Sequence, residues 1–205
     1  MKRCVDWVLW RRGRALCRKI EAWVPPGSRI IDIGSGTGHN GVLLRAAARA
    51  VDEFDVVDMH WAGPGPRLFD GRRLQRPDDD CDAVLLAFVL QYAEDPAALL
   101  REASRLARRR VLVVQSSFEG RLACLLLGMR EHLWGPVALG VARGLGLVGR
   151  FESPLVTRRH YRQTDLRELF ARCGLEEISL ESESWPLLAV RRDFFVLEPR
   201  RDAAT

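Results

Sequence analysis

The sequence lacks the features that mark several protein classes. Its five cysteines are scattered and never spaced as C-x-x-C, which argues against both a zinc site and a disulfide framework. No run approaches the roughly 18 uninterrupted apolar residues of a membrane span, and the first residues lack the apolar core of a signal peptide. Internal repeats and low-complexity linkers are missing as well. These absences predict a protein without a metal site that resides in the cytoplasm.

Lysine is also scarce. Among the 32 cationic residues only Lys2 and Lys19 are lysines, and the rest are arginines. The net charge of +5 would suit nucleic acid if the cations were clustered. The arginines are instead dispersed in pairs and triplets along the chain. This distribution favours a solvated basic surface over a nucleic-acid partner.

The residues that are present predict one domain over 1–205, because 47% of them are hydrophobic and can fill a core. Apolar residues recur at helical spacing over 4–23, with arginines mostly on the other faces. The segment 1–25 is therefore predicted to be a capping helix that ends at Pro25 and Pro26. Three alternatives remain for it: packing on the domain, covering the substrate, or lying on a membrane surface.

A βαβ unit comes next. The run 29–33 predicts a buried strand, 34–38 a glycine turn, the following residues a helix to about Ala50, and 54–58 a second strand. The segment 59–66 is too short for a crossover helix, so an irregular loop should reach a short edge strand at 67–69. The other expected elements are strands at 82–88, 111–115, 176–180 and 193–198, helices at 96–107 and 164–174, and a helical insertion or lid at 119–162.

The glycine turn indicates a ligand site at the carboxyl end of the first strand. Glycines allow positive φ and a close approach of the ligand to the backbone, and the following helix offers free N–H groups. Asp32 stands two residues before the first glycine, and its carboxylate would repel a pyrophosphate. The site therefore suits a cationic ligand, such as one that carries an ammonium and a sulfonium.

The string 31–38, Ile-Asp-Ile-Gly-Ser-Gly-Thr-Gly, resembles the first motif of class I S-adenosylmethionine-dependent methyltransferases. Asp58 stands twenty residues after Gly38, where the resemblance implies an acid that binds the ribose hydroxyls. Asp70 precedes Asp82 by twelve residues and matches the acid that binds the adenine amino group, with the N–H of Gly71 beside it. The segment 88–96 resembles the stretch that follows the family's fourth strand. The likeness covers 30–115 and 161–198, and the shortened loop resembles a group of small bacterial members.

The resemblance implies an α/β, three-layer Rossmann-like sandwich with a mostly parallel seven-stranded sheet of order 3-2-1-4-5-7-6, whose last strand is antiparallel. It also implies S-adenosylmethionine as the cofactor and S-adenosylhomocysteine as the product. The residues expected to bind the cofactor are Asp32, Gly34, Ser35, Gly36, Gly38, His39, Asp58, Met59, Asp70, Gly71, Ala87 and Phe88.

The implied reaction is an in-line attack by a substrate nucleophile on the sulfonium methyl. Because the leaving group is already activated, alignment supplies most of the acceleration, and a base is needed only for a protonated nucleophile. No base is identified. The candidates near the expected methyl position are Gln91, Tyr92, His132, His160 and Tyr161.

The substrate expected from the sequence is a small, apolar molecule. The strand at 82–88 is not followed by the Asn/Asp-Pro-Pro-aromatic string of enzymes that methylate amino groups, and no Pro-Cys pair offers a nucleophile for pyrimidine methylation. The apolar part of the 119–162 insertion would cover a hydrophobic pocket. Two alternatives stay open: an RNA methyltransferase, or a protein that binds the cofactor, or has lost it, and acts as a partner subunit. The oligomeric state is not readable from the sequence.

Overall fold

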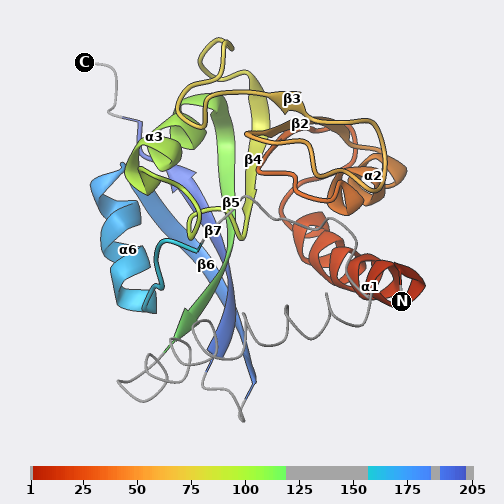
Figure 1. Cartoon of the computed structure of the whole chain (residues 1–205). Coiled ribbons are helices and arrows are strands. Elements are labelled where there is room, and N and C mark those ends of the chain that lie inside the picture. The colour runs from red at the N-terminus through yellow and green to blue at the C-terminus, as the bar shows by residue number, and fades with distance from the viewer. Residues whose placement is uncertain (1, 119–156, 186–189, 202–205) are drawn as a thin grey trace.

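The computed structural model describes residues 2–118, 157–185 and 190–201, and they form a seven-stranded sheet between two layers of helices (Figure 1). The sheet order is β3-β2-β1-β4-β5-β7-β6, as expected, and β7 runs antiparallel to both of its neighbours. The strands are β1 (Arg29–Ile33), β2 (Ala50–Asp55), β3 (Arg67–Leu68), β4 (Cys81–Ala87), β5 (Ala107–Phe118), β6 (Leu175–Trp185) and β7 (Val190–Pro199). The helices are α1 (Lys2–Glu21), α2 (His39–Ala46), α3 (Pro96–Leu106) and α6 (Gln163–Arg172).

Each face of the sheet carries its own apolar core. Figure 1 shows α1 and α2 on one face and α3 and α6 on the other. Ile30 packs into the first core, whereas Ile31 and Ile33 pack into the second. Alternate residues of β1 point to opposite faces, so a strand buried on both sides reads as a continuous apolar run. This is why β1 and β4 were predicted closely from the sequence.

The first helix is packed on the domain. Cys17 and Ile20 are buried in the core that α1 shares with α2. At the crossing of the two helices, a Cβ on Gly13 would lie 2.8 Å from Leu43 Cδ1, so the glycine permits a close approach. Trp7 and Val8 point outward and are exposed. None of the helices described combines the length and apolar character needed to cross a membrane.

The helix α3 begins as the sequence predicts. Asp95 is the N-cap residue, and its carboxylate accepts a hydrogen bond of 2.9 Å from the N–H of Ala98. Pro96 occupies the first helical position, where its missing N–H costs nothing. The second helix on this face is α6, whose Phe170 packs edge-on against Phe195 of β7. Both helices thus cover the face opposite α1.

The second strand ends three residues earlier than its sequence predicts. Phe54, Val56 and Val57 suggest a strand over 54–58, but β2 runs from Ala50 to Asp55, so it also starts four residues earlier than predicted. The reason is pairing: β1 offers partners only from Arg29 to Ile33, opposite Ala50 to Phe54. Beyond this point the chain of β1 turns away, and the N–H of Gly34 closes the pairing on the carbonyl of Phe54 at 2.7 Å.

The connection 56–66 contains no helix, as its length required. It folds back onto the glycine turn, where the N–H groups of Trp61 and Ala62 donate to the carbonyl of Thr37 at 3.1 and 3.2 Å. Most of the expected 119–162 insertion, residues 119–156, lies outside the described residues. Its last part, 157–162, is irregular chain beside β5, where the N–H of Phe118 donates to the carbonyl of Tyr161 at 3.1 Å.

Candidate functional site

The glycine turn at the carboxyl end of β1 is a tightly packed backbone structure. Gly34, Gly36 and Gly38 have φ values of 76°, 57° and 78°, which side-chain-bearing residues rarely adopt. A Cβ on Gly38 would lie 2.1 Å from the carbonyl oxygen of Ala62, so no other residue fits without moving the 56–66 connection. The turn is thus open to a ligand on one side and supported by backbone on the other.

Asp32 lies buried beneath this turn without a partner. Its side chain is 0% exposed, and neither carboxylate oxygen has a hydrogen bond. Burial, and then the charges of Glu53 and Asp55 on the neighbouring strand, raise the pKa of Asp32 well above its ordinary value. The turn therefore rests on a cluster of acids, and a cationic ligand held above it would favour the ionised form of Asp32.

Asp55, the last residue of β2, joins the second strand to the turn. Its Oδ2 accepts a hydrogen bond of 2.9 Å from the N–H of Gly36, and its Oδ1 accepts one of 2.8 Å from the N–H of Val56. A carboxylate has about four acceptor positions, so two remain for hydroxyl groups. From the sequence, Asp58 is expected at the end of this strand, whereas the five-residue length of β1 places the end of its parallel partner at Asp55.

Asp58 and Met59, which the sequence singled out, lie further along the connection. Asp58 is exposed and its Oδ1 accepts a hydrogen bond of 3.0 Å from the N–H of His60. Met59 is half-buried. Asp58 therefore shapes the loop and does not end the strand, because the strand has already lost its pairing partner at Asp55.

Asp70 and Gly71 follow the short edge strand β3, next to Val56. The N–H groups of Arg72 and Arg73 donate to Asp70 Oδ1 at 2.8 and 3.1 Å and lower the pKa of that carboxyl. A Cβ on Gly71 would lie 3.1 Å from Val56 Cγ1. The exposed apolar side chain of Val56 thus lies beside the Asp70 loop, an arrangement that suits a flat ring with polar edges.

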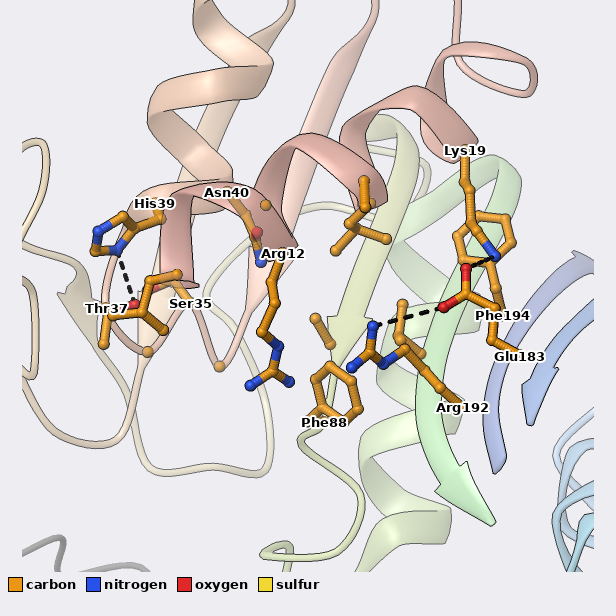
Figure 2. Close-up of a pocket in the computed structure, with 18 residues that line it drawn as sticks. Arg12, Lys19, Ser35, Thr37, His39, Asn40, Phe88, Glu183, Arg192 and Phe194 are labelled. Atoms are coloured by element: carbon orange, nitrogen blue, oxygen red, sulfur yellow. Dashed lines mark hydrogen bonds and ion pairs between the residues drawn. The ribbon is translucent and has the colours of Figure 1, made fainter. Parts of the chain in front are cut away.

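A cavity of about 180 Å³ opens between the glycine turn, α1 and the ends of the central strands. Figure 2 shows its walls. Apolar side chains from α1 and the sheet line most of it, namely Leu9, Leu16, Val114 and Phe194. Of the residues predicted from the sequence, it brings together Gly34, Ser35, Gly36, His39, Ala87 and Phe88. Asp58, Met59, Asp70 and Gly71 do not line it and belong to the neighbouring ends of β2 and β3.

Phe88, directly after β4, stands in this cavity in a strained conformation. Its φ is 60°, which is uncommon for a bulky residue. Its N–H donates to the carbonyl of Val114 at 2.7 Å, which holds the backbone against β5. The ring is thereby presented toward α1 and does not follow the alternation of the strand.

Two histidines secure the turn. His39 Nδ1 lies 3.0 Å from Thr37 Oγ1 and its Nε2 lies 3.0 Å from Asp6 Oδ1, so this buried side chain links the turn to α1. His60 Nε2 lies 2.9 Å from Ser35 Oγ, and its Nδ1 lies 2.5 Å from the carbonyl of Pro64. Both imidazoles are therefore engaged in holding the backbone of the site.

The residues considered as catalytic candidates gather only in part. Gln91 Oε1 accepts a hydrogen bond of 3.0 Å from Gln115 Nε2, and Tyr92 is half-buried beside it in the chain. The hydroxyl of Tyr161 donates to the carbonyl of Leu90 at 3.2 Å, and burial raises its pKa, so this side chain acts in packing. His160 is exposed, and His132 lies outside the described residues.

The sheet order, the glycine turn and the acids at the ends of β1 and β2 define a class I methyltransferase fold. The sequence matches the methyltransferase domain family over residues 9–180. The chain therefore belongs to this family, and its cofactor is S-adenosylmethionine. No curated protein matches the sequence.

Solved structures of similar fold agree with this assignment. A putative methyltransferase from Bacillus halodurans has a TM-score of 0.65 at 12% identity, covering 91% of this chain and 98% of that one. The 1,6-didemethyltoxoflavin-N1-methyltransferase of Burkholderia thailandensis, solved with 1,6-didemethyltoxoflavin and S-adenosylhomocysteine, has a TM-score of 0.62 at 14% identity, covering 96% and 80%. Magnesium protoporphyrin IX methyltransferase from Synechocystis, solved with S-adenosylhomocysteine, has a TM-score of 0.58 at 19% identity, covering 93% and 85%. These likenesses concern the fold.

Proposed function

We propose that this methyltransferase transfers the methyl group to a small, mainly apolar molecule. The observation that supports this is the cavity beside the glycine turn. It is lined largely by apolar side chains, as small-molecule sites commonly are, and its volume of about 180 Å³ is below the usual range for drug-sized ligands. Because Gly34, Ser35 and Gly36 of the glycine turn also line this cavity, the acceptor would share it with the cofactor, and the part of the acceptor that enters is small.

The residues present suit a cofactor that carries two positive charges and a ribose. Asp32 has no hydrogen-bond partner and a raised pKa, so an ammonium or sulfonium held near it would favour its ionised form and be stabilised by it. Asp55 has free acceptor positions at the edge of the turn for the ribose hydroxyls. The exposed Val56, with Asp70 and Gly71, offers an apolar face and polar groups to the adenine.

When bound, the cofactor supplies a methyl group on a sulfonium, which is already activated for transfer. The chain then has to bind the acceptor, align it and exclude water. Leu9 and Leu16 of α1 form the side of the cavity opposite the strand ends, and Phe88 forms the wall at the end of β4. No described side chain of the cavity is placed as a general base, which suits an acceptor whose nucleophile is unprotonated or acidic.

Calorimetry with S-adenosylhomocysteine tests the cofactor half of this proposal. We expect Asp55→Ala to weaken binding roughly 10- to 100-fold, because a charge-assisted hydrogen bond contributes about 1.5–3 kcal/mol. Asp58→Ala is the matched control, three residues away on the same loop, and should leave binding almost unchanged. The milder Asp55→Asn and a thermal unfolding scan of each variant separate lost binding from lost folding. A loss confined to Asp58→Ala would contradict the assignment.

Transfer of a labelled methyl group tests the acceptor half. The full chain is incubated with labelled cofactor and, in parallel arms, with a panel of small apolar molecules and with total RNA. We expect label in the small-molecule fraction only. Label in RNA that declines steeply with salt would favour the RNA alternative. Cofactor binding without transfer in any arm would favour a partner subunit.

A further inference from the structure

Two arginines from opposite ends of the sequence converge on one aromatic ring in the cavity. The guanidinium carbon of Arg12, on α1, lies 5.2 Å from the centroid of the Phe88 ring, and that of Arg192, on β7, lies 5.9 Å from it. Figure 2 shows the two side chains reaching the ring from different walls. Both residues line the same cavity. The two guanidinium groups next to the ring have like charges, and their mutual repulsion opposes this arrangement.

The acids nearby do not neutralise both arginines. Lys19 Nζ lies 3.2 Å from Glu181 Oε2 and 2.9 Å from Glu183 Oε1, whereas Arg192 Nη1 lies 3.6 Å from Glu183 Oε2. These two carboxylates balance the charges of Lys19 and Arg192. Within the described part of the chain, Arg12 has no salt bridge. Partial desolvation, and then the charge of Arg192, lower the pKa of Arg12. One positive charge, that of the exposed Arg12 on the cavity wall, therefore has no acidic partner.

The distance of Arg12 and Arg192 from the residues expected to bind the cofactor indicates which ligand these arginines contact. In the sheet order β2-β1-β4-β5-β7, Arg192 stands four strands from Asp55, or roughly 19 Å at the usual strand spacing. Phe88 lies at the end of β4, between these limits. A cofactor anchored by its ribose at Asp55 occupies the β2 and β1 side, so the arginines face the acceptor side.

We propose that Arg12 and Arg192 bind an oxyanion, such as a carboxylate, on the methyl acceptor. This inference rests on the proposed function and narrows it: the acceptor is an amphipathic acid, with an apolar body against Leu9, Leu16 and Phe194 and an anionic end at the two guanidinium groups. Arginine suits this role because its planar donors match the geometry of a carboxylate and stack on an aromatic face. The anion would relieve the repulsion between the pair.

Benzoate and benzamide are the probes, because they have nearly the same shape and differ in charge. Calorimetry on the full chain saturated with S-adenosylhomocysteine should show benzoate binding at least about tenfold more tightly than benzamide, as expected for a charge-assisted pair. Arg12→Gln and Arg192→Gln should each remove most of this preference. Arg14→Gln removes the same charge from another exposed position on α1, one that does not line the cavity, and should retain the preference. Wild-type protein that binds neither probe, or both equally, would overturn the proposal.

A second comparison separates the acceptor from the cofactor. S-adenosylhomocysteine has a carboxylate, whereas 5′-methylthioadenosine lacks the amino-acid end. Arg12→Gln could weaken binding of S-adenosylhomocysteine but not of 5′-methylthioadenosine, and leave the preference for benzoate intact. In that case Arg12 binds the carboxylate of the cofactor, and the proposal is wrong. If wild-type protein binds neither nucleoside, the proposed function fails, while the comparison of benzoate with benzamide on the free protein still tests the oxyanion site.

Discussion

The two sides of the site are held together by different kinds of contact. The turn side, which comprises the 34–38 turn, Asp55 and Asp70 above the buried Asp32, is fixed mainly by hydrogen bonds to backbone groups, such as that from Gly36 to Asp55 and those from 61–62 to Thr37. On the helix side, the contacts of α1 with the site run through the side chains of Asp6 and Arg12, which meet His39 and Phe88.

This difference matches two kinds of ligand: the cofactor, which every member of the family binds, and the methyl acceptor, which differs between members. A backbone cradle changes little when side chains vary, so it serves a constant ligand, the cofactor. On the proposed function, side chains that meet from α1 and β7 would serve the acceptor, a ligand that varies from one member to another. Changes on the turn side should therefore affect both stability and cofactor binding, whereas changes on the helix side should leave cofactor binding nearly unchanged.

The largest effect is expected at Gly38. Gly38→Ala should lower the free energy of unfolding by about 2 kcal/mol or more, because positive φ alone costs about 1–2 kcal/mol and the new Cβ meets the Ala62 carbonyl. S-adenosylhomocysteine binding should be lost as well. Urea unfolding and calorimetry measure both.

Gly27 is the matched control for this prediction. It also has positive φ, 84°, but an added Cβ finds nothing within 4 Å. Gly27→Ala should cost only about 1 kcal/mol and leave cofactor binding intact. Equal losses in the two variants would show that backbone strain, and not the close approach of the 56–66 connection, defines the turn.

Asp32→Asn should make the protein more stable at pH 7, by about 1–3 kcal/mol, while it weakens cofactor binding. The folded-state pKa of Asp32 is raised above the ordinary 3.8, so the folded chain keeps its proton where the unfolded chain has lost it. Wild-type stability therefore decreases, relative to the variant, as pH rises from about 3.8 through the folded-state pKa.

Urea unfolding of both proteins across this range measures the effect. The free energies of unfolding of wild type and Asp32→Asn should agree at low pH, where Asp32 is protonated in both the folded and the unfolded state. The difference between them should grow as the pH rises. Asp58→Asn, at an exposed position, should stay within about 0.5 kcal/mol of wild type. If Asp32→Asn is no more stable than wild type at pH 7, burial of Asp32 in the acid cluster does not lower the free energy of unfolding.

The smallest effect is expected at Asp6. Asp6→Ala removes the contact with His39 Nε2, a half-exposed hydrogen bond, and should cost about 0.5–1 kcal/mol. His39 keeps its contact with Thr37, so cofactor affinity should change by less than about threefold.

Hydrogen exchange should show faster exchange in the first turns of α1 and unchanged protection in β1. Glu21→Ala, an exposed change at the other end of the same helix, is the control and should leave exchange in the first turns unchanged. If Asp6→Ala also abolishes cofactor binding, the separation between the two sides of the site does not hold.

The sequence by itself determined the architecture and the glycine turn. A buried parallel strand reads as an apolar run, a glycine turn requires glycine, and an N-cap requires a residue such as Asp95, so these elements were predictable from neighbouring residues. The sheet order followed from the resemblance that the 31–38 motif carries. Both ends of β2 were predicted too late in the chain, because a strand extends only as far as its partner, which the run 54–58 does not reveal.

Only the tertiary structure decided the helix side. Arg12 and Arg192 are 180 positions apart, and each reads as an ordinary surface arginine in its own segment. They meet because α1 packs over the sheet and β7 inserts antiparallel beside β5, and because Phe88 leaves the strand geometry to face them. Contacts between distant segments depend on how the elements dock, so residue spacing along the chain carries no record of them.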